Sequence, residues 1–452
     1  MSAKQPQITD GDLPATHKFP QKQIAIMLNK KLKKKEVYKL KSRRCWITRG
    51  IRRGTRADFS HNGSFHEAVG PVFVIAQCFG LMPVRGVLAA TAKGLSFSWL
   101  SFRTYYCLIY TLLTTVCTGL TLNMIVRSAL EVDSISPLVF HVNALLVSIG
   151  FLRLAGKWPQ LMRKWQRVEL LMPPQQSWRE REALSVRVHK VTFVLISLSL
   201  TEHLLSTISA IHFTIHCATH GDAVESYFTA VSSHIFLVFD YSTWLAWFGK
   251  ILNVFMTFGW SYMDVFLMII GIGLSSLFGQ VQSSLELVKG QVMPETYWTR
   301  TRLQYRLICD LIEQVDSAVS GIIMLSFANN LFFVCIQLLR SINKMASTSH
   351  FIYFYASLSF LLGRTLAVSL YLSEINERSR EPLGVIKHVP KEGYCAEVDR
   401  FEHEIAVDNV ALTGLQYFNV TRGLILTVAG TIVTYELVLI QFQKEDKLWK
   451  CS

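Results

Sequence analysis

Eight long apolar stretches constrain this chain more than any other feature of its sequence. They span roughly residues 66–92, 103–126, 135–156, 190–215, 234–275, 316–340, 350–373 and 421–442. A helix needs about 20 apolar residues to cross a bilayer, and a helix satisfies its own backbone hydrogen bonds inside lipid. Half of all residues are hydrophobic and only 17% are charged, which is typical of an integral membrane protein. We therefore expect an all-α membrane protein.

Lysine and arginine are spread unevenly over the connections, and their distribution predicts the direction of each crossing. The first 65 residues carry sixteen of them, and the connection 157–189 is also basic. The connection 216–233 has none, and 341–349 has only Lys344. The N-terminus and 157–189 are thus both expected in the cytosol, so an even number of crossings must separate them. One of the three stretches between them does not cross.

The stretch 66–92 is the best candidate for the one that stays on one side. Pro71, Gly80 and Pro83 interrupt it, and it is expected to form a re-entrant or interfacial helix. Seven transmembrane helices remain, with the N-terminus cytosolic and the C-terminus extracellular. The net charge of +14 then reflects this topology, and no nucleic-acid partner is expected.

Four regions follow from this topology. Residues 1–65 form a basic cytosolic N-terminal arm. Residues 66–375 hold the re-entrant helix and a six-span ligand-binding bundle with cytosolic helix extensions. Residues 376–420 form a cytosolic anchor helix just before the final crossing. Residues 421–452 contain a pore-lining last helix and an extracellular tail.

The last apolar stretch carries polar side chains at a helical repeat. Thr434 and Gln441 are seven residues apart, as are Tyr435 and Phe442, so each pair shares one stripe of a helix. Polar groups inside a membrane need a partner helix or water beside them. A pore built from several copies of this helix provides both, and its expected lining and gate residues are Thr434, Tyr435, Val438, Gln441 and Phe442.

The same residues resemble a known signature. Thr434-Tyr435 followed after six residues by Gln441-Phe442 resembles the C-terminal motif of insect gustatory receptors. Residues 62–69, 258–264 and the tail 410–442 are similar to the sugar-receptor branch, which includes trehalose receptors and a broad sweet co-receptor. The resemblance covers about residue 60 to the end. It implies a tetrameric, ligand-gated, non-selective cation channel, with a sugar pocket in the outward half of each subunit.

Polar and aromatic side chains at pocket depth are the candidate sugar ligands. Sugars stack their C–H faces on aromatic rings and bond their hydroxyls to charged groups and amides. The candidates are Glu202, His203, Asp240, Trp247, Trp260, Asp264, Asn329, Asn330, Tyr353 and Arg364. Glu202 is expected to be the partner of the Trp260–Asp264 pair. The alternative for Glu202, Asp264 and Arg364 is that they pair with one another or with neighbouring helices. Tryptophans near the outer surface more often form an interfacial belt than a ligand cage, and Asn329, Asn330 and Tyr353 could equally bond neighbouring helices.

The nine cysteines show no metal-binding spacing,. Only Cys217 and Cys451 fall on the extracellular side in this topology, where a thiol pair tends to oxidise, so a disulfide between them is predicted. We find no catalytic motif and expect neither an enzyme nor a cofactor.

Three functions remain to be compared. The first is a sugar-gated cation channel in the plasma membrane of gustatory sensory neurons, working with identical or sister subunits in the lipid bilayer. The second is a seven-span sugar receptor that signals through a cytosolic partner, which needs an extracellular N-terminus. The third is a sugar transporter, for which internal repeats are typical and none is apparent.

Overall fold

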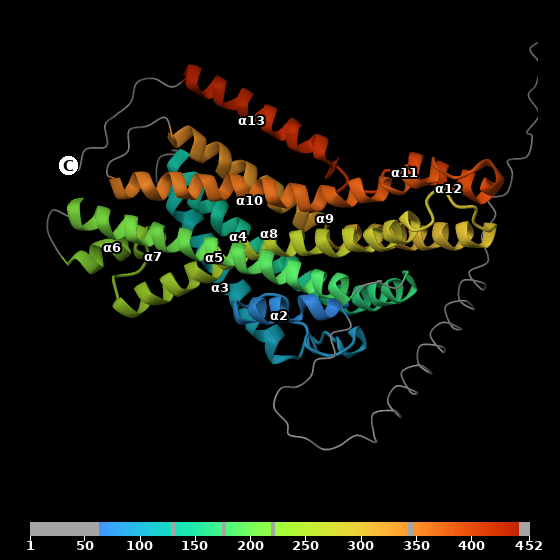
Figure 1. Ribbon diagram of the computed structural model, residues 1–452. Helices are drawn as coiled ribbons and strands as arrows, with labels where there is room; N and C mark the ends of the chain where they lie inside the picture. Colours follow the sequence, from blue (N-terminus) through green and yellow to red (C-terminus); the bar gives the residue numbers. More distant parts are fainter. Residues whose placement is uncertain (1–62, 128–131, 174–177, 218–221, 342–347, 443–452) are drawn as a thin grey trace, which may run out of the picture. The chain divides into compact units, whose positions relative to one another are not determined.

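The computed structural model describes residues 63–127, 132–173, 178–217, 222–341 and 348–442, which are mostly helical (Figure 1). Within these ranges, six helices are long and apolar enough to cross a membrane. They are α3 (Phe102–Arg127), α4 (Val132–Leu171), α5 (Trp178–Cys217), α8 (Thr243–Glu286), α9 (Glu295–Ser341) and α10 (Thr348–Arg380). A further apolar helix, α13 (Arg422–Phe442), has 21 residues, or about 30 Å of helix. The helices confirm the predicted mostly helical fold, and six of them have the length and apolar composition of membrane spans.

The stretch 66–92 forms a short helix followed by irregular backbone. α2 (Phe65–Cys78) has 14 residues, or about 21 Å, which is shorter than the hydrocarbon core of a bilayer. Ser64 caps its first turn by accepting a hydrogen bond from the Glu67 backbone N–H at 3.3 Å. The helix contacts α4, α5 and α8. Its length is consistent with the expectation that this stretch does not cross.

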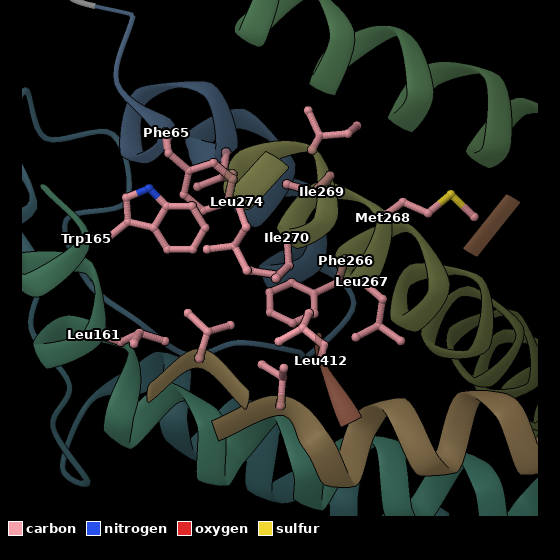
Figure 2. Close-up of a cluster of buried hydrophobic side chains, with 14 of the residues drawn as sticks. Phe65, Leu161, Trp165, Phe266, Leu267, Met268, Ile269, Ile270, Leu274 and Leu412 are labelled. Carbon is pink, nitrogen blue, oxygen red and sulfur yellow. The ribbon is translucent and has the colours of Figure 1, made fainter. Parts of the chain in front are cut away.

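α8 is the central helix of the bundle, because α4, α5, α9 and α10 all contact it. Figure 2 shows the part of its core where α2 and α4 meet α8: the Phe65 ring stacks on Trp165 with centroids 4.1 Å apart. Gly273 leaves room for this pair, since a Cβ there would lie 2.5 Å from the Phe65 ring. The 44 residues of α8 exceed what one perpendicular crossing requires, as its long apolar stretch predicts.

Short elements occupy both ends of the long helices. At one end, α6 (Ala223–Val231) and α7 (Ser233–Phe236) lie between α5 and α8 in the chain. After α10, the range 376–420 contains several elements where the sequence suggests one anchor helix. They are α11 (Pro382–Ile386), η2 (Lys391–Gly393), α12 (Ala396–Val407), β1 (Thr413–Gly414) and β2 (Phe418–Asn419). β1 and β2 are antiparallel, with Thr413 opposite Asn419.

Arginine side chains on α9 hold this segment in place. Arg302, which is buried, donates from Nε to Glu397 Oε2 at 3.0 Å and from Nη1 to Glu404 Oε1 at 2.8 Å. One turn further on, Arg306 donates to Asp408 at 2.7 Å. α12 is therefore fastened to α9 by charge-assisted bonds.

A second connection joins α9 to the hairpin that precedes α13. Asp316 accepts the Thr413 backbone N–H at 2.6 Å on one carboxylate oxygen and the Thr413 hydroxyl at 2.8 Å on the other. At the start of α13, Arg422 lies 3.5 Å from Glu377 of α10. The entrance of the last helix is thus tied to two helices of the bundle.

Replacing Thr413 by valine should weaken the first of these connections. The Thr413→Val variant keeps the side-chain volume but leaves one Asp316 oxygen without its donor, at a cost of about 1–3 kcal/mol. We expect a lower midpoint of thermal unfolding for the purified protein. Thr427→Val is the control, because the Thr427 hydroxyl bonds only within its own helix, to Gly423 O at 3.1 Å. Equal midpoints for the two variants would argue against the connection.

Candidate functional site

Buried polar side chains form a column between α5, α8, α9 and α10, and Asp264 of α8 lies at its inner end. Asp264 is fully buried and Arg364 of α10 is 5% exposed. Arg364 Nε lies 2.9 Å from Asp264 Oδ2, but its N–H is not aimed at that oxygen, so the contact is a charge pair rather than a linear hydrogen bond. The Ser326 hydroxyl and the Asn330 amide, at 3.1 Å, both donate to the same carboxylate. A carboxyl group and a guanidinium group are therefore held together inside the apolar bundle with hydrogen-bond support.

Trp260 places an aromatic face on this pair. It precedes Asp264 by one turn of α8, as the sequence predicts. The Arg364 guanidinium carbon lies 4.7 Å from the centre of the Trp260 ring, within the range of a cation–π contact. Trp260 Nε1 and Arg364 Nη2 both donate to Asn330 Oδ1 at 3.3 Å. Ring, guanidinium, carboxylate and amide thus meet in one place.

A second polar layer lies nearer the start of α10. The Ser357 hydroxyl donates to Glu202 Oε1 at 2.9 Å and accepts from Gln337 Nε2 at 3.2 Å. Ser357 precedes Arg364 by seven residues, which is two helical turns or roughly 10 Å. Tyr353 precedes Ser357 by one more turn, toward the start of α10, and is partly buried. The column therefore has charged groups at two depths.

This arrangement corrects one expectation. Glu202 was predicted as the partner of Trp260 and Asp264, but Arg364 is the side chain that contacts both. Glu202 instead forms its hydrogen bond with Ser357, in the layer nearer the start of α10. The alternative that these charged residues pair with one another describes Asp264 and Arg364 correctly, while Glu202 interacts with Arg364 only through its charge. Sequence spacing fixes which residues share a face of one helix, but not how neighbouring helices are rotated against each other.

Four other predicted sugar ligands do not take part in the hydrogen bonds and ion pair of the column. Asp240 is exposed, and Trp247 is 54% exposed with its ring 5.2 Å from Phe228, as an interfacial belt requires. His203 is partly buried and Asn329 is buried; the His203 Nε2 and both polar atoms of the Asn329 amide have no hydrogen-bond partner among the described residues.

The pore and disulfide candidates are described only in part. On α13 the Thr434 hydroxyl donates to Gly430 O at 2.9 Å, and Val438 is 43% exposed. The side chains of Tyr435, Gln441 and Phe442 lie outside what the structure describes, as do the Cys217 side chain and Cys451. The expected gate and disulfide stay predictions.

Several hydroxyl residues of the column were not predicted. Besides Ser326 and Ser357, the hydroxyls of Ser199 and Ser261 are bonded at 2.6 Å, and Arg364 Nη1 donates to Ser261 at 3.5 Å. A signal for them exists in the sequence. Ser326 and Asn330 are four residues apart within an apolar span. Two polar residues at that spacing share one face of a helix, where they can bond to each other or to a neighbouring helix.

A small cavity lies near the start of α8, lined among others by His141, His234, Lys250 and Asn253. The His141 and His234 rings are 4.8 Å apart, and the space open to water centres is about 20 Å³. That space suits one ordered water and is far smaller than a typical small-molecule pocket.

Sequence comparison gives the family. A family model described as "Trehalose receptor" matches residues 34–451. The chain belongs to the trehalose receptor family. It is similar in sequence to two proteins of Drosophila melanogaster, "Gustatory receptor 5a for trehalose" and "Gustatory receptor for sugar taste 64f". The first is 52% identical over 400 residues, covering 88% of this chain and 90% of the relative. The second is 46% identical over 402 residues, covering 89% and 86%.

Membership of the trehalose receptor family confirms the resemblance to the sugar branch of insect gustatory receptors, and the family is one of receptors and not of enzymes. The solved structures support the fold. The insect olfactory receptor OR5 from Machilis hrabei superposes with a TM-score of 0.65 at 16% identity, covering 86% of this chain and 100% of the receptor. Its complex with eugenol gives 0.59 at 15% identity. The described helices therefore have the fold of an insect chemoreceptor.

Proposed function

We propose that this protein is a sugar-gated, non-selective cation channel in the plasma membrane of gustatory sensory neurons. The observation that carries the proposal is the polar column of Glu202, Trp260, Asp264, Asn330 and Arg364 inside the apolar bundle of a trehalose receptor family member. Ionisable side chains are rare in membrane helices, and those that occur there often mark a ligand path. The column offers a ring face for sugar C–H groups and charged groups for hydroxyls.

The mechanism uses the pair of charges as a preformed hydrogen-bonding surface. A sugar that enters from the outer layer at Glu202 meets a carboxylate, and deeper it meets Arg364 and the Trp260 ring. The guanidinium has five N–H donors, so it bonds sugar hydroxyls without giving up Asp264. Arg364 is only 5% exposed and already contacts Asp264 and Trp260, so binding of this kind moves α5, α8 and α10 apart to admit the ligand.

The gate is proposed on α13. Val438 of this helix is 43% exposed in the single chain, and Thr434 is exposed too, which suits a helix that packs against copies of itself around a central pore. The connections at Asp316 and Arg422 would transmit a movement of α9 or α10 to the start of α13. Four copies then form the pore, with seven crossings per subunit, a cytosolic N-terminus and an extracellular C-terminus.

Removing the proposed gate ring should change the resting state of the channel. An apolar ring at a constriction resists wetting, and an amide beside it hydrates a passing ion once the ring moves. Phe442→Ala is therefore expected to raise the sugar-independent current in whole-cell recordings. Val433→Ala is the control, since nine residues separate the two positions and place them on opposite faces of α13. Resting and sugar-evoked currents equal to those of the control, at equal surface expression, would contradict the gate.

A single set of experiments separates the three candidate functions. Cells that express the receptor are given a panel of sugars that includes trehalose, while current and uptake of labelled sugar are recorded. The channel predicts sugar-evoked cation current without uptake, and an N-terminal tag that antibodies reach only after permeabilisation. Uptake without a matching current identifies a transporter instead. A tag accessible on intact cells indicates a receptor that signals through a cytosolic partner.

A further inference from the structure

The loop between α2 and α3 folds back on itself beside α2 (Figure 1). Arg85 and Ser96 exchange two backbone hydrogen bonds of 2.8 and 3.2 Å. Gly86 has φ 76°, a left-handed conformation that favours glycine. A Cβ on Gly86 would lie 2.1 Å from the Gly94 carbonyl oxygen. The two strands of this loop are thus in direct contact, and the segment η1 (Ala92–Gly94) contacts α4.

Two arginines from neighbouring helices are fixed against this loop. Arg103 Nη1 at the start of α3 donates to Val84 O at 2.8 Å, and Arg163 Nη2 of α4 donates to Leu95 O at 3.0 Å. Backbone carbonyls orient a guanidinium but do not neutralise it, and each side chain keeps further N–H donors. Both guanidinium groups are therefore held in place with their charge uncompensated by these bonds.

Three more exposed cations lie on the same loop and on α4. Arg85 and Lys93 belong to the loop itself, and Lys157 follows Gly156 of α4, where a Cβ would lie 3.9 Å from the Phe97 ring of the loop. We call the five residues Arg85, Lys93, Arg103, Lys157 and Arg163 the basic loop cluster. Among the residues that the structure describes, none of the five forms an ion pair, and segments 79–127 and 134–168 contain no aspartate or glutamate. The cluster therefore presents positive charge without an acidic partner from its own loop or helices.

Apolar side chains stand next to the cluster. Trp99, Leu100 and Phe102 are 62%, 80% and 82% exposed, and the Trp99 ring lies 5.1 Å from Phe97. A tryptophan and large apolar residues beside cations are the arrangement found where a protein meets the boundary between lipid headgroups and acyl chains. A soluble phosphate compound would contact the basic residues but not the exposed apolar side chains. The cations and the apolar side chains together therefore indicate a lipid as the ligand.

We propose that the basic loop cluster binds the headgroup of an anionic phospholipid in the cytosolic leaflet. In the membrane orientation proposed above, the start of α3 lies at the cytosolic surface. The headgroup phosphate is held by the Arg103 and Arg163 guanidinium groups, Arg85, Lys93 and Lys157 add charge, and the acyl chains pack on Trp99, Leu100 and Phe102. The site lies on the loop between α2 and α3, on the start of α3 and on α4, away from the polar column, so it is a second ligand site of the receptor.

The test measures binding of dioctanoyl phosphatidylinositol bisphosphate to the purified full-length receptor in uncharged detergent. Dioctanoyl phosphatidylcholine and inositol trisphosphate serve as a neutral lipid and a headgroup without acyl chains. The first variant carries Arg85→Gln, Lys93→Gln and Lys157→Gln, whose side chains form no hydrogen bond in the described structure, so it should fold normally. The matched control carries Lys289→Gln, Lys387→Gln and Lys391→Gln, which removes the same charge from exposed positions on other elements.

The unmodified receptor and the control should bind the anionic lipid at least about tenfold more tightly than the first variant, since each basic group near a lipid headgroup strengthens binding. A second variant, Arg103→Lys with Arg163→Lys, keeps the charge but not the bidentate geometry, and should bind between these limits. Equal affinities for the first variant and the control overturn the proposal. The proposal is also overturned if the unmodified receptor binds phosphatidylcholine as tightly as the anionic lipid. Equally tight binding of inositol trisphosphate overturns it too, because that result indicates a site for soluble phosphates. Sugar-evoked current is not needed for this assay, so its outcome is independent of the proposed channel function.

Discussion

The Asp264→Ala variant should reach the cell surface in far smaller amounts than the unmodified receptor. The substitution leaves the Arg364 guanidinium, which is only 5% exposed, without its carboxylate. Breaking a buried ion pair from one side costs about 3–5 kcal/mol, because an uncompensated charge stays inside. Surface labelling measures the amount that reaches the cell surface. Fluorescence-detected size-exclusion chromatography after heating measures the loss of thermal stability. Glu286→Ala on the same helix is the control, since its partner Lys289 is 4.0 Å away and both side chains are largely exposed; such pairs contribute little.

The double variant Asp264→Ala, Arg364→Met separates structure from ligand binding. Replacing a whole buried pair by apolar side chains is often neutral for stability, so the double variant should recover much of the surface expression lost by Asp264→Ala. Its sugar response should remain absent or need a much higher sugar concentration, because a hydrogen bond to a charged group contributes about 1.5–3 kcal/mol. If the double variant responds at unchanged sugar concentrations, the pair is purely structural and the sugar binds elsewhere.

Arg302→Ala should have the second large effect, at the end of the bundle that carries α12. Glu397, which is buried, and Glu404, which is partly buried, both accept from this guanidinium, and its loss leaves both carboxylates without that donor. We expect a loss of about 3–5 kcal/mol, seen as a lower unfolding midpoint. Arg400→Ala is the control, because the Arg400 side chain also pairs with Glu397, at 2.9 Å, but is 61% exposed. Equal destabilisation by the two substitutions would show that burial of Arg302 does not matter.

The same network predicts how stability depends on pH. Burial by itself would raise the pKa of Glu397, but hydrogen bonds and charge from Arg302 and Arg400 outweigh burial and hold that pKa below its ordinary value. A carboxyl group whose pKa is lower in the folded state contributes stability above its unfolded pKa and loses it as the pH falls through the folded pKa. The unfolding midpoint of the unmodified protein should therefore fall on acidification below about pH 4. Arg302→Ala should reduce that dependence.

The membrane helices follow from patterns that are local in sequence. The length and hydropathy of the apolar stretches indicate where the long helices lie. The uneven Lys and Arg content of the connections between them sets α2 apart as a stretch that does not cross. Trp260 and Asp264 share a face because they are one turn apart, and this too is local. The pairing of Asp264 with Arg364 is not local, because the two residues are exactly one hundred positions apart and meet only through the packing of α8 on α10.

The loop that carries the basic loop cluster shows the same limit. Its apolar composition and Pro83 indicate a break in the helix, but the pairing of Arg85 with Ser96 and the close approach of Gly86 to Gly94 depend on backbone geometry. The segment after α10 also contains more elements than its mixed charge pattern suggests, since α12 is held by residues of α9 that lie about a hundred positions earlier. Contacts between distant segments decide such details.

The central claim is that a sugar bound in the polar column opens a cation path formed by this chain. The most direct measurement is the conductance of planar bilayers that contain only the purified receptor, with sugar binding by the same preparation checked by its thermal shift. The account predicts stepwise cation currents that appear on addition of the sugar, and their loss in the double variant Asp264→Ala, Arg364→Met. A preparation that binds sugar but stays non-conducting at every concentration would contradict it.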